Sequence, residues 1–119
     1  TIDKVIKRGD EVLSSDVMRG FNSLILLSIL MKEDSYGYQI SNTIKAITDG
    51  KYIMKETTLY SAFNRLEKSA LIQSYSSTET NGKPRTYYRI TDLGKQTYHD
   101  KVSEWLDTKD VMNKFIEEE

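Results

Sequence analysis

The sequence contains no cysteine and only one histidine, one proline and one tryptophan in 119 residues. The absence of cysteine excludes disulfide bonds and any thiolate ligand for a metal or redox centre. His99 alone cannot build a zinc site or a conventional catalytic triad without unusual help. Because no paired-carboxylate, nucleophile–base or phosphate-cradle pattern is present either, we expect a protein that is not an enzyme and uses no metal or cofactor.

Long hydrophobic runs are also missing. The longest extends from Leu24 to Met31 and is interrupted by Ser28, whereas a membrane-spanning helix needs about 20 apolar residues. We therefore expect no membrane association. The residues that follow Thr1 show no secretion signal, so the cytoplasm is the expected location.

Charge is unevenly distributed along a chain whose overall composition is ordinary. A hydrophobic fraction of 38% and a charged fraction of 29% are usual for one soluble, folded domain. From Lys51 to Arg89, seven basic and three acidic residues give a net charge of +4, although the whole chain carries −1. From Asp100 to Glu119, three basic and seven acidic residues give −4. This asymmetry favours an anionic partner for one face of the molecule.

Apolar residues recur at helical spacing in the first half of the chain. The segment from Ile2 to Leu13 predicts a short, weakly held helix. A stronger helix is expected from Asp16, its N-cap, and it is apolar nearly all round after Leu24. Another helix is expected from Tyr36 to Ile47, with apolar residues on one face and Gly50 after its end.

The next predicted helix, over residues 57–69, has two contrasting faces. Its apolar face carries Leu59, Phe63, Leu66 and Ala70. The polar residues on or beside the opposite face are Thr57, Tyr60, Ser61, Asn64, Arg65 and Lys68. Side chains of these types bond base edges and phosphates, although a solvated helix face has the same composition.

After this helix the apolar period changes from that of a helix to that of a strand. Two β-like runs, residues 71–79 and 85–91, are rich in Tyr, Thr, Ser and Ile. The dipeptide Asn81-Gly82 between them is a strong hairpin signal, and Pro84 belongs at the edge of the turn. The hairpin would therefore present Lys83 and Arg85 near its tip.

A last helix is expected from Thr91 or Asp92 to about Ile116. Its apolar stripe is formed by Tyr98, Val102, Trp105, Leu106, Val111, Met112, Phe115 and Ile116. This stripe predicts packing against the same helix of a second subunit, or else against the first main helix of its own chain. Trp105 is expected to be an interface anchor or a flat surface on which an aromatic effector stacks.

The order of three helices, a hairpin and a long helix predicts a mainly α fold with a two-stranded β wing. We expect a winged helix-turn-helix domain with an N-terminal helix over residues 1–91, followed by a C-terminal dimerisation helix over residues 92–119. In such a domain the third helix can enter a major groove while the wing reaches flanking phosphates.

Four ordered segments of the sequence resemble the PadR family of bacterial transcriptional regulators. The segment "VMRGFNSLILLSIL" looks like the opening helix of that family, and "YGYQI" is similar to its second-helix signature. "TTLYSAFNRLEKSALI" resembles the recognition helix, and "GKPRTYYRITDLGK" the wing that leads into the last helix. The likeness covers about Val17 to Lys95 and then the long helix. Within it, Ala70 stands where the family usually has glycine.

This resemblance implies a homodimer that binds a palindromic operator in double-stranded DNA and represses transcription until an effector loosens it. The tail "SEWLDTKDVMNKF" looks like the dimer helix of a small subgroup in which some members stack flat aromatic drugs on a tryptophan. Trp105 matches that position. The other residues expected at the effector site or dimer interface are Leu24, Ser28 and Val102.

We therefore expect a sequence-specific, DNA-binding repressor. Thr57, Ser61 and Asn64 are predicted to contact bases. Base edges or phosphates are predicted to be contacted by Tyr60, Arg65 and Lys68. Lys83 and Arg85 are predicted to contact phosphates or the minor groove, and Tyr38 a phosphate. The alternative is a winged-helix protein-interaction module that binds no DNA and would lack salt-dependent DNA affinity.

Overall fold

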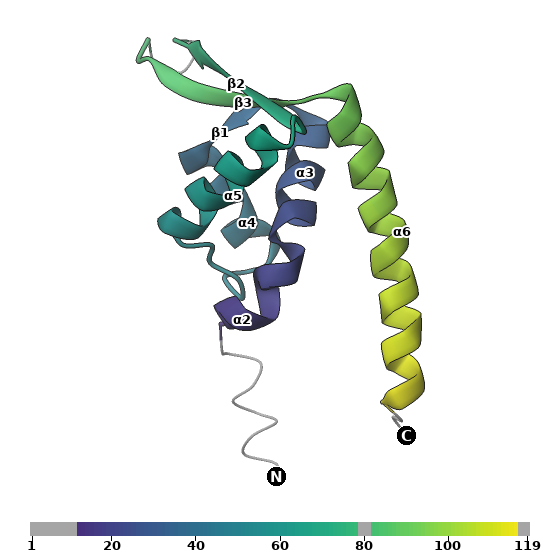
Figure 1. Ribbon diagram of the computed structural model, residues 1–119. Coiled ribbons are helices and arrows are strands. Elements are labelled where there is room, and N and C mark those ends of the chain that lie inside the picture. The colour runs from purple at the N-terminus through teal and green to yellow at the C-terminus, as the bar shows by residue number, and fades with distance from the viewer. Residues whose placement is uncertain (1–11, 79–81, 117–119) are drawn as a thin grey trace.

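The computed structural model describes residues 12–78 and 82–116. It shows a mainly helical body, a small sheet and one long C-terminal helix (Figure 1). The elements in chain order are α2 (Ser15–Met18), the short 3-10 helix η1 (Arg19–Phe21), α3 (Asn22–Lys32), β1 (Ser35–Tyr36), α4 (Gly37–Ile47), α5 (Glu56–Lys68), β2 (Ile72–Ser77), β3 (Arg85–Ile90) and α6 (Asp92–Phe115). The predicted fold class is confirmed.

The core of the body lies where α3, α4 and α5 meet the sheet. Each of these helices turns an apolar face inward, as the helical spacing predicts, and the sheet contributes Ile72 and Tyr88. Phe63 of α5 stacks on Tyr88, with ring centroids 3.9 Å apart. The most deeply buried side chains are Leu26, Leu27, Leu30, Ile40, Ile44, Leu59, Phe63 and Ile72.

The sheet has three antiparallel strands in the order β1-β3-β2. The predicted hairpin of β2 and β3 is present, with register from Ile72 opposite Ile90 to Ser77 opposite Arg85. The third strand, β1, was not predicted, and it pairs Ser35 with Tyr88. Of the predicted turn, Asn81 lies outside the described residues, whereas Gly82 has the positive φ of 70° that such a turn favours.

The long helix α6 begins and ends close to the predicted positions. Thr91 is its N-cap, and the Thr91 hydroxyl accepts a hydrogen bond from the Gly94 N–H at 3.0 Å. From this start α6 runs along the outside of the body beside α3 (Figure 1). Among the described helices, none is both long and apolar enough to cross a membrane.

The structure corrects several details of the N-terminal half. The helix predicted from Asp16 is divided into α2, η1 and α3, and its N-cap is Ser14, which accepts from the Val17 N–H. Ser14, Ser15 and Asp16 are three consecutive residues of types that cap helices, so composition could not choose among them. Most of the helix predicted from Ile2 to Leu13 lies outside the described residues.

Two residues expected on apolar, core-facing stripes are exposed instead. Ile47 is 68% exposed at the last turn of α4. Ala70 lies beyond the end of α5, where the backbone has a positive φ of 62° and the helix no longer sets the side-chain direction. Helical periodicity therefore failed for Ala70 because the helix had ended, and for Ile47 because the last turn of α4 is not covered by the rest of the body.

Candidate nucleic-acid interface

Helix α5 separates its apolar and polar residues as the sequence predicts. Leu59, Ala62, Phe63 and Leu66 are buried in the body. All six polar residues of the predicted DNA-contacting face lie exposed on the outside of the helix: Thr57, Tyr60, Ser61, Asn64, Arg65 and Lys68. The body thus presents one continuous row of hydroxyl, amide and cationic groups to solvent.

A close contact with α4 sets the position of α5. Gly37, the first residue of α4, is buried beneath Tyr60, where an added Cβ would lie 2.5 Å from the tyrosine hydroxyl oxygen. The Tyr60 ring packs edge-on against Phe63, with centroids 5.5 Å apart. Tyr38, one residue further along α4, is 68% exposed. The structure therefore places Tyr38 beside the start of α4, at an exposed position that the predicted phosphate contact requires.

The two predicted cations of the wing differ in their surroundings. Lys83 is exposed near the tip. Arg85 is half-buried, and its guanidinium carbon lies 4.6 Å from the centroid of the Tyr36 ring, a cation–π contact. Arg85 therefore contributes to holding β3 against β1, whereas Lys83 extends toward solvent.

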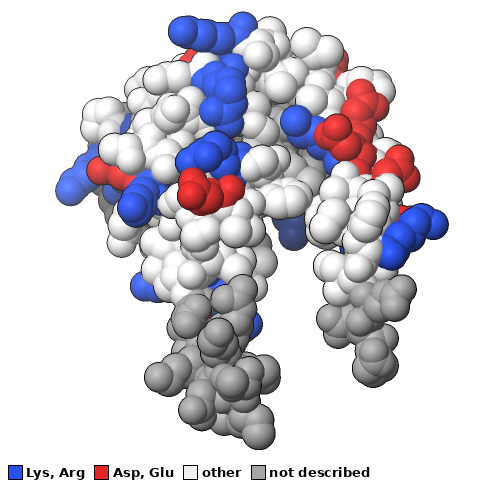
Figure 2. All heavy atoms as spheres, turned by 60° about the horizontal axis from the view of Figure 1, so that its bottom comes forward, with Lys and Arg blue, Asp and Glu red and all other residues white. Residues whose placement is uncertain are grey.

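Charge is distributed over the surface as it is along the sequence. In Figure 2, Lys and Arg side chains form a column over the body, and Asp and Glu side chains gather over α6 on the right. The helix α6 carries five acidic residues along its length: Asp92, Asp100, Glu104, Asp107 and Asp110. The same helix also carries four lysines, Lys95, Lys101, Lys109 and Lys114, so the basic column over the body, rather than α6, is the surface that favours an anionic partner.

An open polar cavity of about 500 Å³ adjoins the exposed face of α5. One wall is formed by Arg19, Asn22 and Ser23, which the sequence analysis did not single out. The other wall is formed by Thr57, Thr58, Ser61 and Arg65 of α5. The two walls are joined by a hydrogen bond in which Arg65 Nη2 donates to Ser23 Oγ at 3.1 Å.

Trp105 lies at the junction of α6 and the start of α3. Its ring packs edge-on against Phe21, with centroids 5.4 Å apart, and it remains 38% exposed. A cavity of about 210 Å³ beside it is also bordered by Leu24. Of the four residues predicted for the effector site, Trp105 and Leu24 thus come together. Ser28 and Val102 do not line this cavity.

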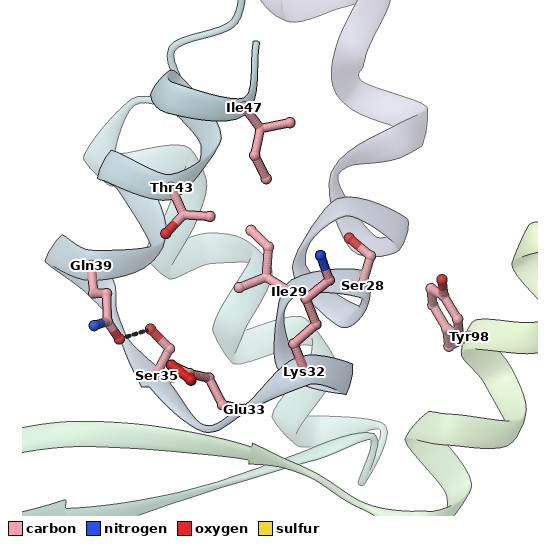
Figure 3. Close-up of a pocket in the computed structure, with 9 residues that line it drawn as sticks. All are labelled: Ser28, Ile29, Lys32, Glu33, Ser35, Gln39, Thr43, Ile47 and Tyr98. Carbon is pink, nitrogen blue, oxygen red and sulfur yellow. Dashed lines mark hydrogen bonds between the residues drawn. The ribbon is translucent and has the colours of Figure 1, made fainter. Parts of the chain in front are cut away.

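Ser28 instead borders a larger cavity of about 470 Å³ between α3, β1, α4 and Tyr98 of α6 (Figure 3). Its apolar lining comes from Ile29, Ile47 and Tyr98. Its polar lining includes Lys32 and the pair in which the Ser35 hydroxyl donates to Gln39 Oε1 at 2.5 Å. The exposed Ile47 borders this cavity.

Comparison with protein families and individual proteins gives a consistent result. The family model of the transcriptional regulator PadR-like family matches residues 26–100. An uncharacterized protein of Lysinibacillus sphaericus is 40% identical over 106 residues, which is 89% of this chain and 97% of that protein.

Solved structures show the same similarity. A transcriptional regulator from Clostridium thermocellum is 54% identical, with a TM-score of 0.80, and the alignment covers 86% of this chain and 99% of that one. A PadR family transcription regulator from Clostridium difficile is 38% identical, with a TM-score of 0.71, covering 80% of this chain and 97% of the other.

Proposed function

Because the chain belongs to the PadR-like family of transcriptional regulators, we propose that it is a repressor that binds a palindromic operator as a homodimer until an effector releases it. Membership in the family implies DNA-binding regulation of transcription. A regulator of this kind acts where the chromosome lies, so the proposed location is the cytoplasm.

The observation that best supports DNA binding is the exposed polar face of α5, on the same body as the exposed Lys83 of the wing. In the proposed complex, α5 enters a major groove. Bases are contacted by Thr57, Ser61 and Asn64. Tyr60, Arg65 and Lys68 contact base edges or phosphates, and Tyr38 and Lys83 contact phosphates. Arg85, already stacked on Tyr36, has a smaller direct part.

The distal half of α6 supports the proposed homodimer. Beyond Trp105 the helix exposes large apolar side chains that the body does not cover: Leu106, Val111, Met112, Phe115 and Ile116. A second copy of α6 would bury this face. A twofold axis through the pair would then place two α5 helices on one side of a palindromic operator, with half-sites about one helical turn apart.

The small cavity at Trp105 supports the proposed effector site. Its volume of about 210 Å³ is below the range of about 300–1,000 Å³ that is usual for ligand pockets. In the proposed dimer, the second subunit supplies another wall and the two halves form one site. An aromatic molecule would stack there on the exposed face of Trp105, between two copies of α6.

Fluorescence anisotropy tests the DNA-binding proposal. A labelled duplex from upstream of the protein's own gene and a scrambled duplex of equal length are titrated across a salt series. The proposal predicts tighter binding to the upstream duplex and an affinity that falls steeply with salt. Absence of binding to either duplex at low salt would contradict it and would favour a winged-helix module that binds another protein.

A further inference from the structure

The polar cavity between α5 and the start of α3 has the chemistry of an anion site. Arg19 and Arg65 each contribute a guanidinium group, and hydroxyl groups come from Ser23, Thr57, Thr58 and Ser61. Guanidinium groups and hydroxyls are the usual donors to phosphate oxygens. The described lining residues include no carboxylate.

The cavity is held in shape from within the body. Asn22, which lines it, is only 5% exposed, and its Oδ1 accepts a hydrogen bond of 2.6 Å from the buried Tyr52 hydroxyl. Arg65 Nη2 bridges to Ser23 Oγ. These two hydrogen bonds fix Asn22 to the body and connect the α3 wall of the cavity to the α5 wall, which lowers the cost of ordering those side chains when an anion enters.

We propose that this cavity binds a backbone phosphate of DNA, with Arg19 and Ser23 as contacts outside both the helix-turn-helix and the wing. The inference rests on the proposed DNA-binding function, because the cavity opens beside the face of α5 that would lie in the groove. The phosphate would be contacted from one side by α5, through Arg65, and from the other by η1 and α3. Such a contact sets the register of the protein on the duplex and reads no base.

Asp16 opposes this contact. Its Oδ1 lies 2.8 Å from Arg19 Nη2, and both side chains are more than 70% exposed, at 84% and 75%. An exposed ion pair of this kind is weak, so a phosphate can take the place of the carboxylate. Removing the Asp16 charge should therefore strengthen DNA binding, whereas removing Arg19 should weaken it.

The test compares Arg19→Gln with Lys114→Gln, which loses the same charge from the last turn of α6. At about 100° per residue, Lys114 lies opposite Trp105, and sedimentation equilibrium checks that its substitution leaves the proposed dimer unchanged. In a dimer, Arg19→Gln removes two phosphate contacts and should lower the salt slope by about 1.8. The factor by which Arg19→Gln binds DNA more weakly than the wild type should shrink about tenfold between about 50 and 200 mM salt. Upstream and scrambled duplexes should be affected alike, and the Lys114→Gln slope should equal that of the wild type.

Asp16→Asn supplies the opposite result and shows whether Asp16 acts through Arg19. It should tighten binding to both duplexes in the wild-type background and have no effect in the Arg19→Gln background. An equal gain in both backgrounds would identify a long-range charge effect and contradict the proposed competition. Thermal unfolding of each variant confirms that the folded state is retained.

The outcomes separate this inference from the function on which it rests. If the wild type binds neither duplex, the repressor proposal fails and the cavity assignment fails with it. If the wild type binds normally and Arg19→Gln has the salt slope of Lys114→Gln, only the cavity assignment is wrong. Inorganic phosphate that raises the melting temperature of the wild type but not of Arg19→Gln, without any change in DNA affinity on substitution, would identify a site for free anions.

Discussion

The helix-turn-helix body and the distal half of α6 carry similar apolar side chains in opposite surroundings. Phe63 in the body is fully buried, whereas Phe115 near the end of α6 is 78% exposed. The body buries a central set of apolar side chains within one chain, whereas the large apolar side chains of distal α6 are all exposed. The difference indicates that the body is held together by its own core, while distal α6 requires a partner surface to lose its contact with water.

The largest effect is expected when the core of the body is opened. Phe63→Ala removes a ring that stacks on Tyr88 at 3.9 Å and leaves a cavity among buried neighbours. The free energy of unfolding should fall by about 3–5 kcal/mol. Urea denaturation followed by circular dichroism measures this change. A loss below about 1 kcal/mol would show that the body repacks and would weaken the contrast with α6.

The joint between the two regions should be the next most sensitive. Gly94 is buried at the start of α6, and an added Cβ would clash with the carbonyl oxygen of Leu71 and lie 2.7 Å from Ile90 Cγ1. Gly94→Ala should cost about 1–3 kcal/mol of unfolding free energy and also weaken DNA binding, because α6 must shift. The matched control is Gly20→Ala, whose Cβ would meet no atom within 4 Å. An equal cost for both variants would contradict the account.

On distal α6, the same type of truncation should change assembly and leave folding of the body intact. Phe115→Ala removes one ring from each subunit and should weaken the proposed dimer by about 1.5–3 kcal/mol per subunit, which corresponds to a rise of at least about a hundredfold in the dissociation constant. Sedimentation equilibrium measures the constant, and Lys114→Ala is the neighbouring control. If the protein remains monomeric at high concentration, distal α6 has another partner.

The smallest effect is a gain in stability at Ala70. This residue adopts a φ of 62°, a conformation that costs an L-residue about 1–2 kcal/mol and that glycine adopts freely. Ala70→Gly should raise the free energy of unfolding by about 1 kcal/mol. Ala62→Gly, in the buried interior of α5, should lower it by about the same amount. Destabilisation by both substitutions would show that Ala70 has contacts worth more than its backbone strain.

The sequence predicted those features that depend on local chemistry. Periodicity located the helices, and Thr91 marked the start of α6 because a hydroxyl cap has a characteristic residue. Gly50 has a positive φ of 79°, but the first left-handed residue after α4 is Asp49, with a φ of 52°. The polar face of α5 followed from the same periodicity, since the apolar face had to turn inward. The position of Trp105 beside the first helical segment agrees with one of the two packings expected for α6, that against the first main helix of its own chain.

Features that depend on contacts between distant segments could not be predicted in this way. The strand β1 has two residues and exists because Ser35 and Tyr36 lie against β3, far along the chain. The polar cavity is lined by both Arg19 and Arg65. Arg19 lies in the 3-10 helix η1, which no feature of the composition indicated. The stacking of Arg85 on Tyr36 likewise depends on the pairing of β1 with β3, which the sequence did not reveal. The Arg85 side chain was therefore expected to project from the wing.

The hydrogen bonds at Thr91 tie the start of α6 to the end of α5. The Thr91 N–H donates to the Leu71 carbonyl oxygen at 3.0 Å, and the Thr91 hydroxyl donates to the Ala70 carbonyl oxygen at 2.8 Å. With 24 residues, α6 is about 36 Å long, so a tilt of about 5° about this end would move its far end by about 3 Å. In the proposed dimer, a molecule that separates two such helices would therefore change the distance between the two α5 helices without entering either core.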